Sequence, residues 1–256
     1  MSRVYAITNQ KGGVGKTTTA INLATYLAAA GRRVLLVDMD PQSNTTSGIG
    51  VAKHLRPHNL YDLLVQEDED LSIFDVIVPT QRRELVVAPC TVDLAAAEIE
   101  LVGALAREHR LRQVLAPIRE RCDYIIIDCP PSLGLLTVNA LVAADGLLIP
   151  IQCEYLALEG LSHLLNTIQM VKSKLNPELY IAGVVLNMFD PRTRLAGEIV
   201  REVRSHFPKE VFKTIINRNV RLSEAPSFGQ SILDYDPHSP GAVAYRSLAE
   251  EVMARG

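Results

Sequence analysis

The sequence predicts an α/β protein whose doubly wound, mostly parallel sheet is covered by helices on both faces. Three observations indicate this fold class. Short apolar runs alternate with segments of helical periodicity along the 256 residues. Two of these runs end in a carboxylate, at Asp38 and at Asp128, as is typical of strands that end at the ligand-binding edge of such a sheet. A turn with three glycines, at 12–15, follows the first run and precedes a helical segment. Since 48% of the residues are hydrophobic, we expect residues 1–256 to form a single domain around one sheet.

The first half of the chain supplies the first two strands with a helix between them. The apolar run at 4–8 is the first strand, and apolar residues three and four apart predict a helix at 18–30. Gly31 stands where a left-handed cap ends such a helix. A buried parallel strand is expected at 33–38. The polar segment at 43–50 is suited to a mobile loop.

Less regular elements are expected between 59 and 121. They are a short helix at 59–65 capped by Asn59, a strand at 84–88, and helices at 93–108 and 111–121. The apolar faces of the two longer helices comprise Leu94, Ile99, Leu101 and Leu105, then Leu111, Val114, Leu115 and Ile118. Pro117 must kink or shorten the second of them. The acidic residues at 67–70 are either solvated surface or a docking place for a basic peptide.

The second half continues the alternation of strands and helices. The expected elements are strands at 124–128, 146–152 and 180–186, and helices at 135–144, 158–175 and 241–255. Each strand is followed by a helix long enough for a crossover, so the strands should run parallel.

Composition excludes several classes of protein. The four cysteines, Cys90, Cys122, Cys129 and Cys153, show no C-x-x-C spacing, so we expect small buried residues rather than a zinc site or a disulfide framework. The chain opens without a signal peptide and has no apolar run of transmembrane length. We therefore expect a soluble, cytoplasmic protein.

The glycine-rich turn has the chemistry of a phosphate-binding loop. Its glycines let backbone N–H groups converge on one point, and the following helix adds its positive N-terminal end. Lys16 supplies a cation for the β- and γ-phosphates, and the Thr17 hydroxyl can ligate Mg²⁺. An ordinary strand-to-helix turn is the alternative. The expected nucleotide contacts are Lys11, Gly12, Gly13, Val14, Gly15, Lys16, Thr17 and Thr18.

Residues 11–18 read Lys-Gly-Gly-Val-Gly-Lys-Thr-Thr and depart from the ordinary P-loop, because Gln10 replaces its first glycine. This form resembles the deviant Walker A motif of the ParA/MinD/NifH group of P-loop ATPases. The resemblance implies that Lys11 is the signature lysine, which crosses to the nucleotide of a second subunit. There it would act as an arginine finger does, so hydrolysis would require a homodimer.

Two aspartates complete the site that the resemblance implies. The sequence around Asp40 is similar to the family's second motif, whose aspartate faces the γ-phosphate and positions the attacking water, although a capping aspartate in a turn is the alternative. The run ending at Asp128 resembles a Walker B strand, whose carboxylate holds Mg²⁺ through a coordinated water. The implied cofactor is Mg²⁺, with Thr17, Asp40 and Asp128 as its protein contacts.

Asparagines are the candidates for contacts with the base. The family uses an asparagine at the position of Asn187 to read the adenine edge, but a turn-forming asparagine fits as well. Residues 215–226 match the loop that closes over the base and include Asn217 and Asn219. Relatives commonly carry proline at the position of Asn217, so this chain departs from the pattern there.

A basic region distinguishes the possible subtypes. Between 192 and 221 there are eight basic and three acidic residues, an excess of five positive charges in a chain of net charge −3. Such an excess favours nonspecific binding to a phosphate backbone. Arg192 and Arg221 match DNA-contacting arginines of ParA-type proteins. Arg201 and Arg204 are equally compatible with a solvated helix in which Glu198 pairs with Arg201.

Three classes within the group remain. A ParA/Soj-type partition ATPase would bind nonspecific double-stranded DNA as an ATP dimer, associate with the nucleoid, and be released by a ParB/Spo0J-type partner. A MinD-like membrane-associated positioning ATPase needs a terminal amphipathic helix, and the last twelve residues are poor in bulky apolar side chains. A NifH-like reductase shares an iron–sulfur cluster through loop cysteines, whereas the cysteines here lie in or beside strands. The first class is favoured. Since the loop begins ten residues into the chain, we expect no N-terminal operator-reading domain, so that locus specificity comes from the partner.

Overall fold

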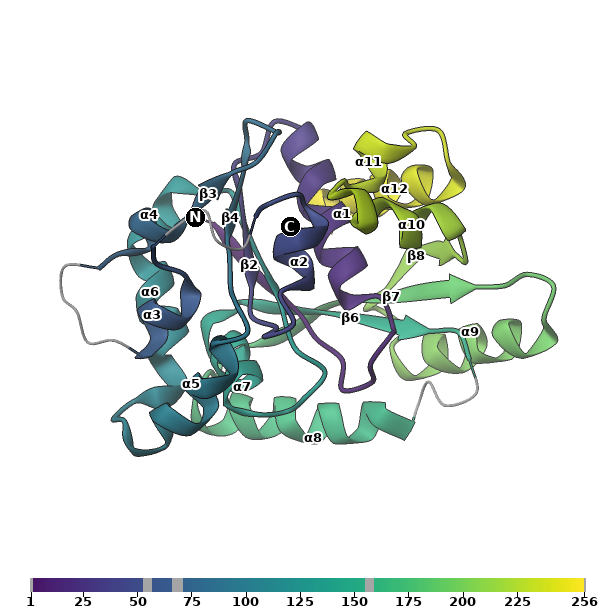
Figure 1. Cartoon of the computed structure of the whole chain (residues 1–256). Helices are drawn as coiled ribbons and strands as arrows, with labels where there is room; N and C mark the ends of the chain where they lie inside the picture. The colour runs from purple at the N-terminus through teal and green to yellow at the C-terminus, as the bar shows by residue number, and fades with distance from the viewer. Residues whose placement is uncertain (1, 53–56, 66–70, 155–158, 256) are drawn as a thin grey trace.

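The computed structural model describes residues 2–52, 57–65, 71–154 and 159–255. Strands in these ranges form one eight-stranded sheet in the order β3-β4-β2-β5-β1-β6-β7-β8 (Figure 1). The strands are β1 (Arg3–Ile7), β2 (Val34–Asp38), β3 (Val78–Pro79), β4 (Leu85–Ala88), β5 (Tyr124–Asp128), β6 (Gly146–Gln152), β7 (Tyr180–Phe189) and β8 (Val211–Asn217). Their order reverses on either side of β1, as in a doubly wound sheet.

The sheet is parallel except at one edge. Only the two-residue β3, among the described strands, pairs antiparallel, with β4. Central strands such as β2 and β5 are buried on both faces, which explains their continuous apolar sequences. The predicted fold class, a doubly wound and mostly parallel α/β sheet, is confirmed.

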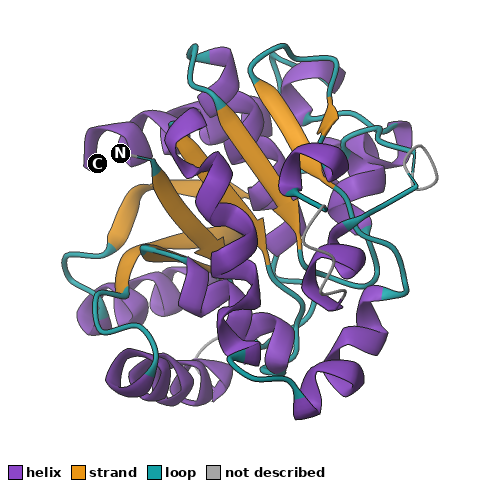
Figure 2. Ribbon diagram, turned by 90° about the vertical axis from the view of Figure 1, so that its left-hand side faces the viewer, coloured by secondary structure: helices purple, strands orange, loops and turns teal. Residues whose placement is uncertain are grey.

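Helices cover both faces of the sheet (Figure 2). They are α1 (Lys16–Ala29), α2 (Asn44–Gly48), α3 (Leu60–Val65), α4 (Ile73–Val76), α5 (Leu94–Glu100), α6 (Arg110–Leu115), α7 (Leu135–Ala143), α8 (Glu159–Lys174), α9 (Arg194–His206), α10 (Val220–Glu224), α11 (Ile232–Tyr235) and α12 (Pro240–Arg255). One core lies under α1 and α12, and the other lies under α7, α8 and α9. Because each face of the sheet has its own apolar layer, both faces of the central strands are removed from water.

The last helix packs into the protein. Tyr245, Leu248 and Val252 of α12 are buried in the same core as α1. The hydroxyl of Tyr245 lies 3.1 Å from the hydroxyl of Thr19 and shares a hydrogen bond with it. The apolar side of α12 is therefore already covered by the sheet and by α1. In the described parts of the chain, no helix combines the length and the apolar character needed to cross a bilayer.

The segment 43–50 was predicted as a mobile loop, and this prediction is wrong. It contains α2, whose Thr45 and Thr46 are fully buried. The hydroxyl of Thr45 donates to Asp128 Oδ2 at 2.6 Å, and that of Thr46 donates to Asp38 Oδ2 at 2.7 Å. These long-range bonds to the sheet fix a segment that has no apolar periodicity of its own.

The predicted helix at 93–108 is also wrong in length. It ends at Glu100 and continues as 3₁₀ turns, Leu101–Gly103 and Arg107–His109. Leu94 and Leu101 are buried as expected, but Ile99 is 76% exposed and Leu105 is 91% exposed. The helical path is interrupted at Ala104, which is extended with a ψ of 141°, and Ala106 then adopts a positive φ of 51°.

Other local predictions hold. Gly31 ends α1 with a φ of 78°, and the side chain of Asn59 accepts a hydrogen bond from Tyr61 N–H at the start of α3. Pro117 lies in a 3₁₀ turn that replaces the second half of the helix predicted at 111–121. The four cysteines are buried and unpaired. The acidic cluster at 67–70 lies outside the described residues.

Candidate functional site

The glycine-rich loop lies at the centre of the carboxyl edge of the sheet. Gly13 and Gly15 have φ values of 74° and 88°, a conformation that favours glycine. A Cβ on Gly15 would lie 2.2 Å from the Nδ2 atom of Asn187, so space also restricts this position. Since α1 begins at Lys16, its free N–H groups face the loop. A cavity of about 390 Å³ lies there, lined by Gly12, Gly13, Gly15, Lys16, Thr17, Thr18, Asp40, Gln42, Asn44, Pro131 and Met188.

The two lysines of the loop have different surroundings. Lys16 is buried, and its Nζ donates to the carbonyl oxygen of Lys11 at 3.2 Å. Burial lowers the pKa of Lys16, while the charges of Asp128 and Asp40 oppose that change. Lys11 is half-buried, and its own N–H donates to Asn9 Oδ1 at 3.0 Å. Its ammonium makes no ion pair with any carboxylate in the described ranges. Lys16 is therefore committed to this site, whereas the charge of Lys11 is available.

Asp128 is fully buried at the tip of β5, beside the loop. Its Oδ2 accepts hydrogen bonds from the hydroxyls of Thr17 at 2.8 Å and Thr45 at 2.6 Å. Its Oδ1 is buried and has no hydrogen-bond partner. Burial, followed by repulsion from Asp38, raises the pKa of Asp128 to about 7. An unsatisfied carboxylate oxygen next to a threonine hydroxyl fits a hard cation such as Mg²⁺.

Asp38 is a functional residue that the sequence reasoning placed at the strand tip without a role. Its carboxylate accepts the N–H and hydroxyl of Thr46 and the N–H of Asp40. Burial raises the pKa of Asp38 to about 6. Asp38 lies opposite Asp128 in the β2–β5 register, and the bonds from Thr46 fix both the strand tip and α2. The two adjacent threonines, Thr45 and Thr46, follow shortly after a strand that ends in an aspartate. This pattern could have indicated the hydrogen bonds between them and the strand ends.

Asp40 lies two residues beyond β2 and lines the loop cavity. It is buried, and its Oδ1 accepts the N–H of Gln42 at 3.0 Å. The Cys90 thiol donates to the Asp40 carbonyl at 3.0 Å, which holds this turn against β4. Asp40 is therefore both the turn aspartate of the alternative interpretation and a carboxylate that faces the phosphate site.

A second cavity, of about 210 Å³, adjoins the first on the side of β7 and β8. Its lining residues are Thr18, Asn187, Met188, Asn217, Arg218, Asn219, Leu222 and Ser223. Thr18 and Met188 line both cavities, so one nucleotide can reach from the loop into the second cavity. The predicted asparagines are thus brought together beside the phosphate loop.

The three asparagines are held differently. The amide of Asn187 donates to the Val14 carbonyl at 2.9 Å and accepts from the N–H of Met188. Asn219 caps α10 by accepting the N–H of Arg221 at 2.9 Å. Asn217 ends β8 and is exposed. The side chain of Asn187 therefore supports the phosphate loop itself, and Asn217 is the least constrained of the three.

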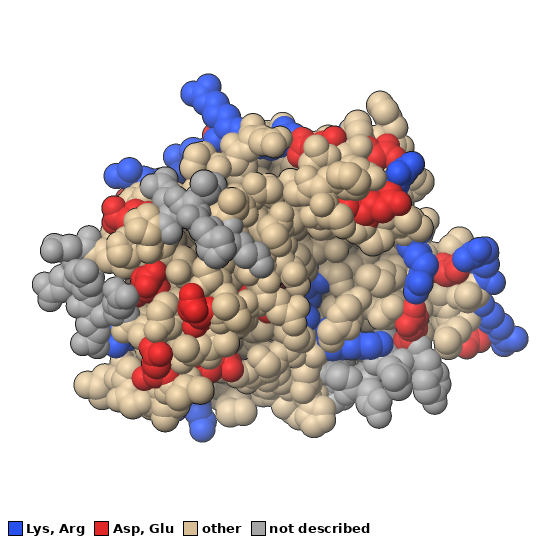
Figure 3. All heavy atoms as spheres, in the orientation of Figure 1, with Lys and Arg blue, Asp and Glu red and all other residues tan. Residues whose placement is uncertain are grey.

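The predicted basic region occupies the side of the molecule around α9 and the ends of β7 and β8. Lys and Arg side chains gather there, with acidic side chains among them (Figure 3). Arg192 pairs with Asp190, and Arg221 pairs with Glu224 at 3.0 Å and with Asp236 at 3.6 Å.

On α9 the helical ion pair differs from the expected one. Glu198 pairs with Arg194 at 2.9 Å rather than with Arg201. Arg201 and Arg204 are exposed on the helix and form no ion pair with the described part of the chain. Within the described residues, Arg201 and Arg204 are thus unpaired cations, as Lys209 and Lys213 are, whereas Arg192 and Arg221 are paired.

Comparisons with known proteins agree with this geometry. A family profile described as "AAA domain" matches residues 2–181. The sporulation initiation inhibitor protein Soj of Bacillus subtilis is 55% identical over 256 residues, covering 100% of both chains. The chromosome partitioning protein ParA of Myxococcus xanthus is 55% identical over 255 residues, covering 100% of this chain and 89% of its own. The chain belongs to the ParA/Soj family.

Membership of this family supports two general statements about the protein. It has a role in partitioning, and it is an ATPase. A solved structure supports the nucleotide site of this ParA/Soj-type chain. Cobyrinic acid a,c-diamide synthase from Mycobacterium smegmatis, with bound ADP and magnesium, superposes with a TM-score of 0.85. It is 36% identical and covers 99% of this chain and 94% of its own. A nucleotide with Mg²⁺ is thus found in this fold family.

Proposed function

We propose that the protein is an ATP-dependent dimerising switch for chromosome or plasmid segregation. The observation that supports it most directly is the contrast within the loop. Lys16 is buried within the field of Asp128 and Asp40 and donates to the Lys11 carbonyl, whereas the Lys11 side chain is half-buried and forms no ion pair with the described part of the chain. Lys11 then reaches the nucleotide of a second protomer and neutralises charge in the transition state.

Hydrolysis uses residues from three strand tips. The N–H groups of Gly12, Gly13, Val14, Gly15, Thr17 and Thr18 hold the phosphates, together with Lys16. Asp40 orients the attacking water. Thr17, Asp128 and Asp40 would hold Mg²⁺, which would neutralise charge on the phosphates. Asn187, Asn217 and Asn219 surround the base. Turnover to ADP and phosphate is slow without partner and DNA.

The ATP-bound dimer binds double-stranded DNA without sequence preference. Arg192, Arg221, Arg201 and Arg204 contact phosphates, and two basic surfaces joined in one dimer gain avidity. A ParB/Spo0J-type centromere-binding protein stimulates hydrolysis and releases the dimer. The protein is cytoplasmic and nucleoid-associated.

The alternative, a MinD-like membrane-associated ATPase, is disfavoured by α12. A membrane-binding helix needs an apolar face that is available to lipid. Most apolar side chains of α12, including Tyr245 and Leu248, are buried against the sheet and α1, and only Val243 among its large apolar residues in the described chain is exposed.

The test is ATPase activity measured with DNA, with liposomes, and with a basic ParB-like peptide, separately and together. We expect stimulation by DNA plus peptide. Stimulation by liposomes instead would select the membrane class, and the absence of any ATPase activity would overturn both.

A further inference from the structure

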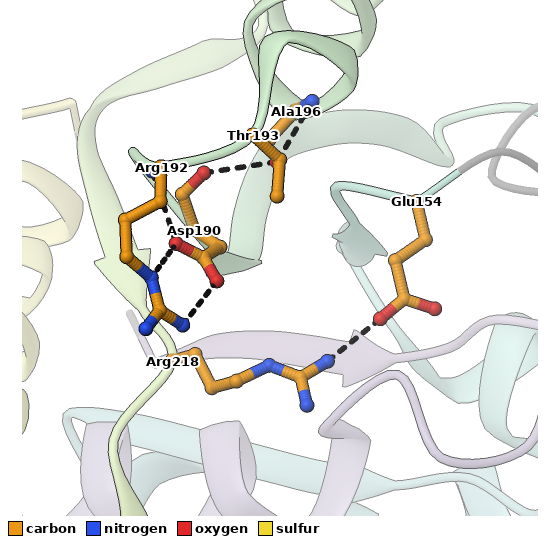
Figure 4. Close-up of polar contacts among 6 residues, drawn as sticks. All are labelled: Glu154, Asp190, Arg192, Thr193, Ala196 and Arg218. Atoms are coloured by element: carbon orange, nitrogen blue, oxygen red, sulfur yellow. Dashed lines mark hydrogen bonds and ion pairs between the residues drawn. The ribbon is translucent and has the colours of Figure 1, made fainter.

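The arginine that is the leading candidate for DNA contact is already bound to a carboxylate of its own chain. Arg192 Nε lies 2.9 Å from Asp190 Oδ1, and Arg192 Nη2 lies 2.7 Å from Asp190 Oδ2 (Figure 4). This is the two-pronged geometry in which a guanidinium also binds a phosphate. Arg192 is 84% exposed, so DNA can approach it, but the two-donor edge formed by its Nε and Nη2 is occupied by Asp190.

The turn before α9 holds Asp190 in this position. The N–H of Arg192 donates to Asp190 Oδ1 at 3.0 Å, and the N–H and hydroxyl of Thr193 both donate to the Asp190 carbonyl at 3.1 Å. Thr193 in turn caps α9 by accepting the N–H of Ala196. Asp190 is therefore anchored at both its backbone and its side chain, whereas Asp190 is the only ion-pair partner of the Arg192 guanidinium within the described residues.

The neighbouring Arg218 does not replace Arg192 as the partner of Asp190. Arg218 lies beside it but directs its Nη2 to Glu154, at 2.7 Å (Figure 4). The hydrogen bonds from Arg192 hold the pKa of the Asp190 carboxyl at about 2, so Asp190 is ionised throughout the neutral range. A DNA phosphate must therefore displace a negative charge to use the Nε–Nη2 edge of Arg192, and it meets that charge next to it if it binds the remaining donors.

We propose that Asp190 is an internal competitor of DNA phosphate for Arg192, which lowers the DNA affinity of each protomer so that stable binding requires both protomers of a dimer. The inference rests on the proposed DNA binding and adds a residue that opposes it. When a DNA phosphate replaces the Asp190 carboxylate at Arg192, one ion pair is exchanged for another, so the net gain in binding free energy is small. The displaced carboxylate stays within a Debye length of the phosphate and repels it. One protomer alone then binds weakly, and two in one dimer bind by avidity.

The test is the affinity of the full chain for a mixed-sequence DNA duplex, followed by fluorescence anisotropy at several salt concentrations, with and without ATP. Asp190→Asn removes the charge and keeps an oxygen for the N–H of Arg192. We expect roughly two- to fivefold tighter binding per protomer and a salt dependence steeper by about one counterion. The variant should also bind DNA measurably without ATP.

Two further variants separate competition from a general change in charge. Glu202→Gln removes one negative charge from α9, where this carboxylate has no ion pair with the described residues. It should have a smaller effect than Asp190→Asn. When Arg192 is first replaced by Gln, adding Asp190→Asn should increase DNA affinity by no more than Glu202→Gln does. The reason is that the arginine for which Asp190 and the phosphate compete is then absent.

The outcomes are distinct. If the wild-type protein with ATP binds DNA but Asp190→Asn binds no more tightly than Glu202→Gln, or binds more weakly, the competition is refuted and the proposed function stands. If the same gain persists in the Arg192→Gln background, the competition is also refuted. If the wild-type protein with ATP does not bind DNA at any salt concentration, both the proposed function and this inference fail.

Discussion

The phosphate loop and the basic region hold their charges in opposite ways. At the loop, Asp128 is buried with one oxygen unsatisfied, and the charge of Lys11 has no described partner. In the basic region, Arg192 and Arg221 are exposed and already paired with carboxylates. In the proposed function, Mg²⁺ and a partner's nucleotide would supply the partners that Asp128 and Lys11 lack, whereas DNA would have to replace the carboxylates that already pair with Arg192 and Arg221. The two regions are therefore expected to differ in how much binding at them gains.

The largest expected effect is at the buried cation of the loop. Lys16→Ala removes the charge that balances Asp128 and Asp40 and that binds the phosphates, so ATP affinity should fall by about a hundredfold or more. Isothermal titration calorimetry with Mg-ATP measures it. Lys172→Ala is the control, since Lys172 lies on α8 and lines neither cavity. Tight ATP binding by Lys16→Ala would contradict the assignment of the phosphate site.

A second variant separates binding from turnover at the same site. Asp40→Ala keeps the loop and the phosphate contacts but loses the group that orients water. Turnover should fall on the order of a hundredfold to a thousandfold while ATP-dependent dimerisation persists. Single-turnover phosphate release, with sedimentation of the ATP-bound state in parallel, tests both parts. Normal turnover would leave Asp40 only its role in the turn.

At the other region the expected effect is smaller. Arg192→Glu should weaken DNA binding by about tenfold, to a similar extent for unrelated sequences, and reduce the salt slope. Dimerisation should be unchanged. Arg83→Glu is the matched charge reversal, because Arg83 is 96% exposed on the β3–β4 turn, outside the basic region. Equal weakening by both variants would show that only net charge matters.

A separate prediction concerns stability and pH rather than ligand binding. The pKa of Asp128 is raised from its ordinary 3.8 to about 7, so between these values the folded protein retains a proton that the unfolded chain loses. The free energy of unfolding should therefore fall as pH rises from about 4 to about 7, and then level off. Thermal midpoints without nucleotide or Mg²⁺ measure this. Asp128→Asn should make the fall smaller, and the part that remains is expected from Asp38, whose pKa is raised to about 6. A wild-type profile that rises over the same range would be inconsistent with a buried, unbalanced carboxylate.

The sequence predicted those parts that follow local rules. Apolar runs ending in Asp38 and Asp128 identified the strands at the active edge, and Gly31 identified the end of α1, because each depends on a few adjacent residues. The glycine-rich loop with its two lysines identified the family.

The remaining parts depend on contacts between distant residues. The segment around Thr45 is helical because its hydroxyl reaches Asp128, 83 positions away, and no local periodicity encodes that bond. Likewise, the residues after Glu100 are rich in helix formers, yet the chain becomes extended at Ala104 and leaves Leu105 exposed. The pairing of Arg192 with Asp190 required the geometry of the turn before α9, which a count of charges does not include.

The central claim is that Lys11 acts on the nucleotide of the partner protomer, and mixing two inactive variants tests it directly. Lys11→Ala retains Asp40, and Asp40→Ala retains Lys11. In a mixed dimer, the Lys11→Ala protomer has its own Asp40 and receives Lys11 from its partner. With DNA and the partner protein present, an equimolar mixture should recover about a quarter of wild-type turnover, since half of the dimers are mixed and each has one complete site. If the mixture stays as inactive as either variant alone, Lys11 acts within its own protomer and the account is contradicted.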